Sequence, residues 1–278
     1  MQGRLYIRLS KKLERNQENM KQKVVGQVIS QKEIAPMIFD MWIDTTLAGE
    51  AQPGQFICVY PKDKSTLLPR PISICEVRED RKALRIVYRV AGAGTKEFSA
   101  YRAGESIAVM GPLGNGFPVK AGEAKKAFLI GGGIGVPPML ELAKQLERVG
   151  CQVQSVMGYR NQDTFLKQDL EQYGPVYVAS EDGSAGTRGN VMDAIRENAL
   201  EADVIFACGP LPMLRAIKTY AEEKKIPAYI SLEERMACGV GACLGCVAKT
   251  KNVDAHSHVH NARICTDGPV FLAEEVEI

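Results

Sequence analysis

Four cysteines near the C-terminal end give the sequence its clearest chemical signal. Cys238, Cys243 and Cys246 lie within nine residues in "RMACGVGACLGCVAKT", and Cys265 follows after 18 further residues in "RICTDGPVF". Structural zinc sites usually combine two closely spaced pairs of ligands. Three crowded cysteines with a distant fourth are instead the plant-type spacing of a [2Fe–2S] cluster. The spacing therefore favours an iron–sulfur cluster, with zinc and disulfides as the alternatives.

The glycines between these cysteines suit a cluster-binding loop. Gly239, Gly241 and Gly245 can adopt positive φ, so we expect them to turn backbone N–H groups toward the cluster sulfurs. Such hydrogen bonds help to set the reduction potential of a cluster. Of the four cysteines elsewhere, three are expected to be small core residues: Cys58, Cys75 and Cys151.

Two glycine-containing turns are candidates for nucleotide binding. "LIGGGIGVPPM" places Gly132, Gly133 and Gly135 where a strand passes into a helix, and backbone amides at such a turn can receive a pyrophosphate. "FACGPLPML" ends another strand with Cys208, Gly209 and Pro210, and the carboxyl ends of strands are where open α/β sheets bind ligands. We expect Cys208 beside a nicotinamide ring, with a buried thiol as the alternative.

A third loop bears on the choice between NAD and NADP. "SEDGSAGTRGNV" offers Glu181 and Asp182, which could accept hydrogen bonds from a ribose and repel a 2′-phosphate. Arg160 and Arg188 oppose that argument, so the loop favours NAD only mildly.

The N-terminal half carries residues suited to another phosphate-bearing cofactor. In "LLPRPISICEV", Arg70 could pair with a phosphate and the Ser73 hydroxyl with a ring heteroatom. In "VYRVAGAGTKEFS", the ring of Tyr88 could stack, and Gly94 and Thr95 precede a short helix that could receive an anion.

Three kinds of sequence must position these residues. Short β-branched or aromatic runs fill the first part and predict an antiparallel barrel of six strands. Strands then alternate with helical stretches, which predicts a doubly wound parallel sheet. The Gly-rich cysteine segment is too short for a core of its own. We expect four parts: an N-terminal extension (1–22), an FAD-binding β-barrel (23–121), an NAD-binding α/β domain (122–232) and a [2Fe–2S] domain (233–278).

Composition excludes some classes of protein. A net charge of +2 gives no footprint of nucleic-acid binding, and no apolar run is long enough to cross a membrane. Eight cysteines without a secretory signal indicate a reducing compartment, so we expect a cytoplasmic protein. "HSHVH" could present its three histidines on one face as metal ligands, but an exposed hairpin is favoured: His256, His258 and His260.

The motifs R-P-I-S, Y-R-V with G-T, G-G-G-I-G and C-G-P resemble the ferredoxin–NADP⁺ reductase superfamily. The cysteine segment is similar to that of the electron-transfer subunits of bacterial NAD-dependent (class B) dihydroorotate dehydrogenases. This resemblance implies a [2Fe–2S] cluster on Cys238, Cys243, Cys246 and Cys265. It also implies FAD contacts from two motifs: Arg70, Pro71, Ile72, Ser73, Val87, Tyr88, Arg89, Gly94 and Thr95.

The resemblance further implies a partner subunit that carries FMN and oxidises dihydroorotate to orotate in de novo pyrimidine (UMP) biosynthesis. Two copies of each subunit would form a heterotetramer. Electrons would pass from FMN through [2Fe–2S] and FAD to NAD⁺, and no residue for the oxidation itself is visible in this chain.

Three rival interpretations remain at this point. The first is a reductase subunit of a sulfide dehydrogenase or of an NADH-dependent ferredoxin:NADP⁺ oxidoreductase. The second is a redox-sensing or assembly module that binds flavin and cluster without turnover, and the third is a zinc-stabilised nucleotide-binding protein.

Overall fold

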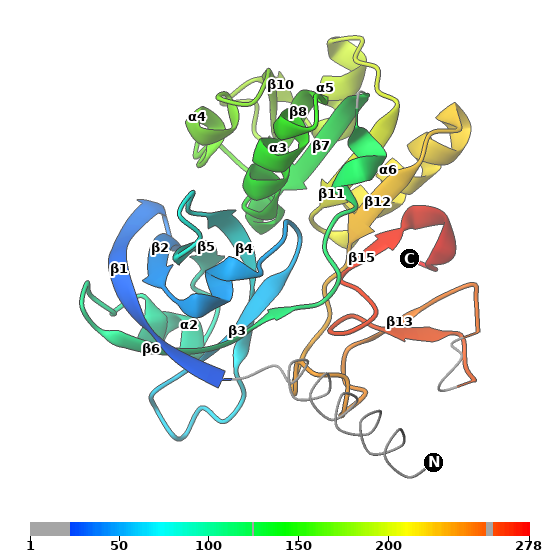
Figure 1. Ribbon diagram of the computed structural model, residues 1–278. Coiled ribbons are helices and arrows are strands. Elements are labelled where there is room, and N and C mark those ends of the chain that lie inside the picture. The colour runs from blue at the N-terminus through cyan, green and yellow to red at the C-terminus, as the bar shows by residue number, and fades with distance from the viewer. Residues whose placement is uncertain (1–22, 124, 254–257) are drawn as a thin grey trace, which may run out of the picture.

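The computed structural model describes residues 23–123, 125–253 and 258–278. The expected N-terminal extension lies outside the described residues. The predicted barrel and parallel sheet are both present, and the cysteine segment lies beside them (Figure 1). The fold class expected from the sequence is therefore confirmed.

Six antiparallel strands close into the barrel in the order β1-β2-β5-β4-β3-β6. Side chains alternate across each strand, so Ile57 and Val59 point into the barrel core while Phe56 and Cys58 face outward. Helix α2 (Ala93–Phe98) follows β5. The strands are β1 (Lys23–Ala35), β2 (Ile38–Asp44), β3 (Phe56–Tyr60), β4 (Arg70–Val77), β5 (Ala83–Arg89) and β6 (Ser106–Leu113).

The second part is a seven-stranded sheet in the order β10-β9-β8-β7-β11-β12-β15. All neighbouring pairs run parallel except β12 and β15, which are antiparallel. The strands are β7 (Lys126–Gly132), β8 (Gln152–Tyr159), β9 (Val176–Ser180), β10 (Thr187–Arg188), β11 (Val204–Cys208), β12 (Ala228–Ser231) and β15 (Val270–Leu272).

Helices cover both faces of this sheet. Apolar side chains of α3 (Pro138–Arg148) and α4 (Lys167–Leu170) pack in one core. Those of α5 (Val191–Glu197) and α6 (Leu211–Lys224) pack in another. Helix α3 begins at a proline and is followed by Gly150 with φ of +73°, as its sequence predicts. None of the described helices is long and apolar enough to cross a membrane.

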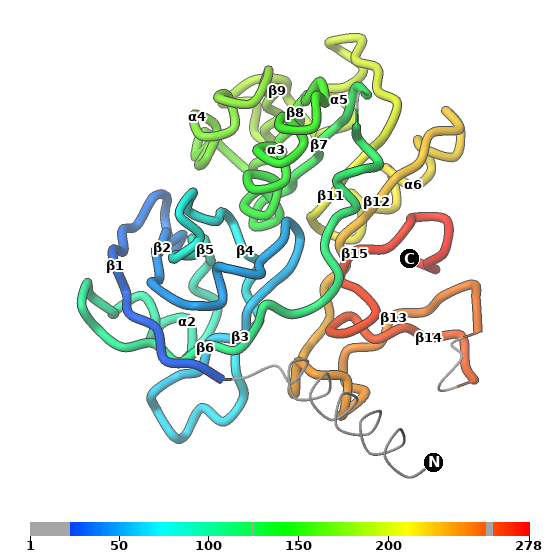
Figure 2. Tube along the Cα trace, in the orientation of Figure 1, coloured from blue at the N-terminus to red at the C-terminus, as the bar shows by residue number. Residues whose placement is uncertain are grey.

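The cysteine segment leaves the sheet after β12 and returns to it as β15 (Figure 2). In between, β13 (Val247–Lys249) and β14 (Asn261–Arg263) form a two-stranded sheet. A short 3₁₀ turn, η4 (Ala273–Glu275), follows β15. The sequence did not predict that part of this segment completes the nucleotide-binding sheet.

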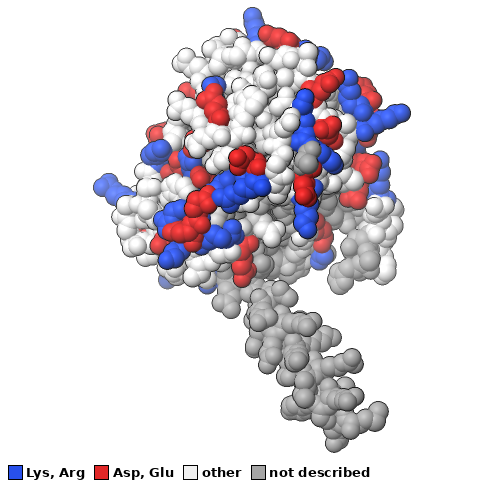
Figure 3. Space-filling view, turned by 45° about the horizontal axis from the view of Figure 1, so that its top comes forward, with Lys and Arg blue, Asp and Glu red and all other residues white. Residues whose placement is uncertain are grey.

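A buried ion network joins the barrel to the α/β part. The Arg85 guanidinium donates to both carboxylate oxygens of Asp40, at 3.0 and 2.9 Å. It also donates to Glu76 at 3.1 Å and to Asp169 of α4 at 2.9 Å. Because these groups come from β2, β4, β5 and α4, the network fixes how the two parts pack. On the surface, charges of both signs intermix over the face shown in Figure 3.

Candidate cofactor sites

The four predicted cluster ligands lie in two neighbouring segments, 238–246 and the turn at Cys265, and differ in exposure. Cys246 and Cys265 are buried, Cys238 is half-buried and Cys243 is exposed. The Gly241 N–H donates to Cys265 Sγ at 3.1 Å, and the Val240 N–H donates to Cys238 Sγ at 3.4 Å. The expected inward-turned amides are therefore present for two of the sulfurs.

Positive φ angles occur in this loop, but not at every position that the sequence suggested. Gly239 and Gly241 have φ of +73° and +79°. Gly245 does not adopt positive φ, and its neighbour Leu244 does, at +54°. A Cβ at Gly241 would lie 2.9 Å from the Thr266 methyl group, so the loop leaves no room for a larger residue there.

The residues fit a plant-type cluster in number and chemistry. Two buried thiols accompany two more accessible ones, and backbone N–H groups already donate to sulfur, as they do to cluster thiolates. Within the described ranges, no group of three or more His, Cys, Asp or Glu side chains is arranged to hold a metal ion. None of the eight cysteines forms a disulfide.

Cys58 is buried in the core, as the sequence predicts, and it also lies against the cluster loop. It is fully buried on the outward face of β3 and packs in the same apolar cluster as Cys246 and Cys265. A Cβ at Gly239 would lie 3.0 Å from Cys58 Sγ. Nothing local in "QFICVY" marks this contact, because Cys58 and Gly239 are 181 positions apart in the sequence. Cys75 and Cys151 are buried in the other core, as expected.

Two separate motifs of the barrel come together at the predicted FAD site. The Arg70 guanidinium lies on Gly94, because a Cβ there would be 2.9 Å from Arg70 Nε. Arg70 also donates to the Leu68 carbonyl at 2.6 Å. The Thr95 hydroxyl accepts the Ala91 and Gly92 N–H groups and orders the turn into α2. An arginine beside this turn suits a pyrophosphate.

The other predicted FAD residues have different surroundings. Pro71 is exposed, Ser73 half-buried and Ile72 buried on β4. The ring of Tyr88 is only 2% exposed, and its hydroxyl donates to Gln31 at 2.8 Å inside the barrel. The ring therefore faces the barrel core in the structure, and contact of Tyr88 with FAD, through its ring or its backbone, stays a prediction. Val87 is buried on the opposite face of β5.

Arg89, the last residue of β5, points toward the nucleotide turn. Its Nη2 atom would be 3.6 Å from a Cβ at Gly133, which has φ of +54°. The end of the barrel strand thus lies beside the turn that the sequence predicts for nicotinamide nucleotide.

The two nucleotide turns meet where the order of the sheet reverses. Strand β7 lies between β8 and β11, so its carboxyl end and that of β11 flank the switch point at which open α/β sheets bind ligands. A Cβ at Gly135 would lie 2.2 Å from the Cys208 carbonyl oxygen, and one at Gly132 3.0 Å from Pro210 Cδ. The turns therefore pack directly on each other.

Cys208 ends β11 between Gly131 and Ser231 of the neighbouring strands. Its side chain is buried, and burial raises the pKa of the thiol to about 12. Both of the expectations for Cys208, a buried thiol and a place at the nucleotide site, are compatible with this position. At the same edge, Glu181 and Asp182 follow β9 and are exposed.

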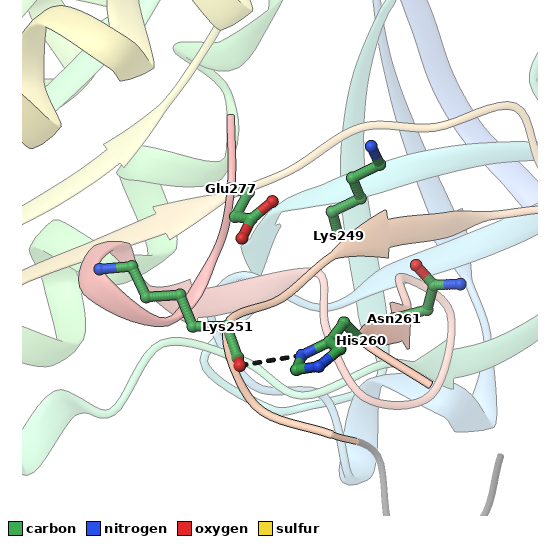
Figure 4. Close-up of a pocket in the computed structure, with 5 residues that line it drawn as sticks. All are labelled: Lys249, Lys251, His260, Asn261 and Glu277. Carbon is green, nitrogen blue, oxygen red and sulfur yellow. Dashed lines mark hydrogen bonds between the residues drawn. The ribbon is translucent and has the colours of Figure 1, made fainter. Parts of the chain in front are cut away.

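Two of the three histidines lie within the described residues. His258 and His260 are exposed, and His256 lies outside the described residues. The His260 ring Nδ1 is 3.0 Å from the Lys251 carbonyl oxygen, which makes Nδ1 the donor (Figure 4). Together with the Lys249, Asn261 and Glu277 side chains, these residues line an open surface pocket.

Two family models match the chain in the same order as the parts described above. The model of oxidoreductase NAD-binding domains matches residues 129–219. The model of the iron–sulfur cluster binding domain of dihydroorotate dehydrogenase B matches residues 233–277. The second match decides among the alternatives for the four cysteines in favour of the cluster.

Curated relatives extend over nearly the whole chain. The dihydroorotate dehydrogenase B (NAD(+)) electron transfer subunit of Geobacillus sp. (strain WCH70) is 44% identical over 253 residues, covering 90% of this chain and 96% of the relative. The subunit of the same description from Listeria innocua serovar 6a is 44% identical over 254 residues, covering 91% and 98%.

Solved structures agree on the fold. A structure of an NADH-dependent reduced ferredoxin-NADP oxidoreductase has a TM-score of 0.81 at 30% identity, covering 91% of this chain and 90% of that one. A ferredoxin NADP⁺ reductase from Neisseria gonorrhoeae, solved with FAD and NADP, shares the fold at 15% identity with a TM-score of 0.61, covering 72% and 91%. With its relatives matched over almost their full length, the chain belongs to the family of dihydroorotate dehydrogenase B (NAD⁺) electron transfer subunits.

Proposed function

We propose that this chain carries electrons between a dihydroorotate-oxidising partner subunit and NAD⁺, in the formation of orotate for pyrimidine synthesis. The observation that carries the proposal is that three predicted binding sites pack together in one chain: the cluster loop, the flavin residues of the barrel and the nucleotide turns. The cluster loop contacts barrel strand β3, and the end of barrel strand β5 lies beside the nucleotide turn. A one-electron site and a two-electron site thus flank the barrel.

A flavin on the barrel would supply the step between these sites, because it exchanges two electrons with nicotinamide and single electrons with a cluster. Arg70, Gly94 and Thr95 would hold its pyrophosphate. The turns at Gly132–Gly135 and Cys208–Pro210 would receive the dinucleotide. Ser73 and the backbone of Val87, Tyr88 and Arg89 complete the predicted flavin contacts.

The partner would dock at the exposed side of the cluster loop. Cys243 is the most accessible of the four ligands, and its neighbours Val240 and Leu244 are 45% and 57% exposed. Exposed apolar side chains around a functional site are typical of an interaction surface. We propose that the partner carries FMN, that two copies of each subunit form a heterotetramer, and that the complex is cytoplasmic, which eight cysteines without a disulfide support.

The test is NAD⁺ reduction by dihydroorotate, measured at 340 nm with the chain alone and after co-expression with an FMN-containing dihydroorotate dehydrogenase subunit. Activity in the pair alone supports the proposal. A pair that is inactive although NADH still bleaches the chain's flavin would overturn the choice of partner.

The structure at 30% identity favours one specific rival, an oxidoreductase that acts on ferredoxin and NADP. Steady-state assays of the pair with NADP⁺ and reduced ferredoxin separate the two functions. Turnover with these substrates and none with dihydroorotate would establish the rival.

A further inference from the structure

The outward face of β3 joins the flavin-bearing part of the barrel to the cluster loop. Cys58 lies opposite Pro71 of the R-P-I-S motif in the β3–β4 ladder and opposite Met110 in the β3–β6 ladder. Its side chain points away from the barrel core, which Ile57 and Val59 fill. One residue therefore touches both the strand proposed to bind FAD and the loop that holds the cluster.

The contact on the cluster side is tight. The position of a Cβ on Gly239 would be 3.0 Å from Cys58 Sγ, 3.3 Å from Leu113 Cδ1 and 3.4 Å from Met110 Cε. Gly239 directly follows the ligand Cys238. Cys58 Sγ is thus the barrel atom nearest to the Cβ position of Gly239, and it packs against the backbone of the cluster loop.

The peptides that follow Gly239 are those that donate to sulfur. Val240 N–H donates to Cys238 Sγ, and Gly241 N–H donates to Cys265 Sγ. Hydrogen bonds to cluster sulfurs stabilise the reduced, more negative state and so raise the reduction potential. Where the Gly239 peptide lies determines how well both bonds form.

We propose that Cys58 is a positioning residue that sets the reduction potential of the [2Fe–2S] cluster through Gly239. The inference rests on the proposed function only in taking the four cysteines as cluster ligands. Cys58 ligates no iron. Its sulfur fills the space under the loop and holds the two N–H···S bonds at their observed lengths.

The test is the reduction potential and the electron paramagnetic resonance spectrum of the reduced cluster in the purified full chain. In Cys58→Ala the loop can relax toward the barrel, so the bonds weaken and the potential falls. We expect about a tenfold change in the reduction equilibrium, which is about 59 mV for a one-electron couple, with shifted g-values. Cys58→Ser, which keeps the shape of the side chain, is expected to change both less.

Cys75→Ala is the matched control. Cys75 is equally buried in the adjacent strand β4 but packs in the other core, away from the cluster. Its replacement by alanine should leave the potential and the spectrum as in the wild type. Equal spectra and potentials in Cys58→Ala, Cys75→Ala and the wild type would overturn the proposal.

A second perturbation approaches the same contact from the loop. Gly239→Ala puts a methyl group against Cys58 Sγ and should also disturb the spectrum, and Cys58→Ala in the same chain makes room for that methyl. Partial return of the spectrum in the double variant supports direct contact, whereas additive effects contradict it. A failure of the proposed function is distinguishable from a failure of this inference. In that case the reduced cluster would not transfer electrons to the partner in the wild type or in any Cys58 variant.

Discussion

The buried network around Arg85 allows a quantitative prediction about stability. Arg85→Met keeps most of the aliphatic packing and removes a guanidinium whose side chain is 9% exposed. Asp40, at 3% exposure, then loses two hydrogen bonds, and its remaining cationic neighbour is the exposed Lys32 at 3.8 Å. Breaking a buried pair in this way costs about 3–5 kcal/mol, which corresponds to a melting temperature lower by about 6–20 °C.

The barrel offers a control with the same fork geometry. Arg78 donates to both oxygens of Asp80 at 2.9 and 2.8 Å, but the two side chains are 40% and 45% exposed. Arg78→Met should therefore cost much less stability than Arg85→Met, because water screens an exposed pair. Far-UV circular dichroism melts of the two variants, recorded anaerobically beside the wild type, compare the pairs directly.

Equal losses of stability in Arg85→Met and Arg78→Met would show that burial does not decide how much the Arg85–Asp40 pair contributes. The double variant Arg85→Met with Asp40→Leu should regain most of the loss, because it no longer buries an unpaired carboxylate at position 40.

Three further predictions concern the cofactor sites. Gly94→Ala should displace the Arg70 guanidinium and weaken FAD binding about ten- to a hundredfold, as for loss of a charged hydrogen bond, in fluorescence titrations of FAD into flavin-stripped chain. Gly92→Ala, where a Cβ meets nothing within 4 Å, should bind FAD normally. Equal loss of FAD affinity in the two variants would contradict a pyrophosphate site at Arg70 and Gly94. Because burial raises the pKa of Cys208 to about 12, the thiolate fraction at pH 9 falls to about 0.1% from about half for a thiol of pKa 9. Iodoacetamide should therefore label Cys208 appreciably only in unfolded chain, as mass spectrometry of the peptide would show, and rapid labelling of native chain at pH 9 would refute the assignment. Cys243→Ala should lose the cluster absorbance and electron transfer to the partner but retain bleaching of the flavin by NADH, and normal transfer to the partner would exclude Cys243 as a ligand.

Much of the fold could be predicted because local patterns agree with it. Short β-branched runs became the barrel strands, and "PPMLELAKQLERVG" became α3 with its proline start and glycine stop. The cysteine spacing predicted the iron–sulfur domain that the family model matches, because three of the cysteines are close in sequence. The meeting of Arg70 with Gly94 was expected only through the resemblance, since a sequence does not state which barrel strands lie side by side.

The misses have physical causes. The strand "ALRIVYR" alternates: Leu84, Ile86 and Tyr88 pack in the barrel core, and Val87 packs outside it. The expectation for the Tyr88 ring rested on its residue type and not on this alternation. Gly245 was expected to supply a positive φ that the backbone takes at Leu244 instead. The contact of Cys58 with Gly239 depends on how two distant parts pack, which no local pattern encodes.

The antiparallel pairing of β12 with β15 has a consequence for how the cluster segment becomes ordered. Ser231 and Val270 are paired across the ladder, so residues 232–269 form one long connection whose two ends are already side by side. Closing such a loop costs conformational entropy that grows only slowly with its length, and the sheet meets that cost through the β12–β15 ladder. The connection then adds the β13–β14 pairing and the contacts around the four cysteines and Cys58. In this way the sheet of the larger domain holds in place a cofactor-binding segment that has little core of its own.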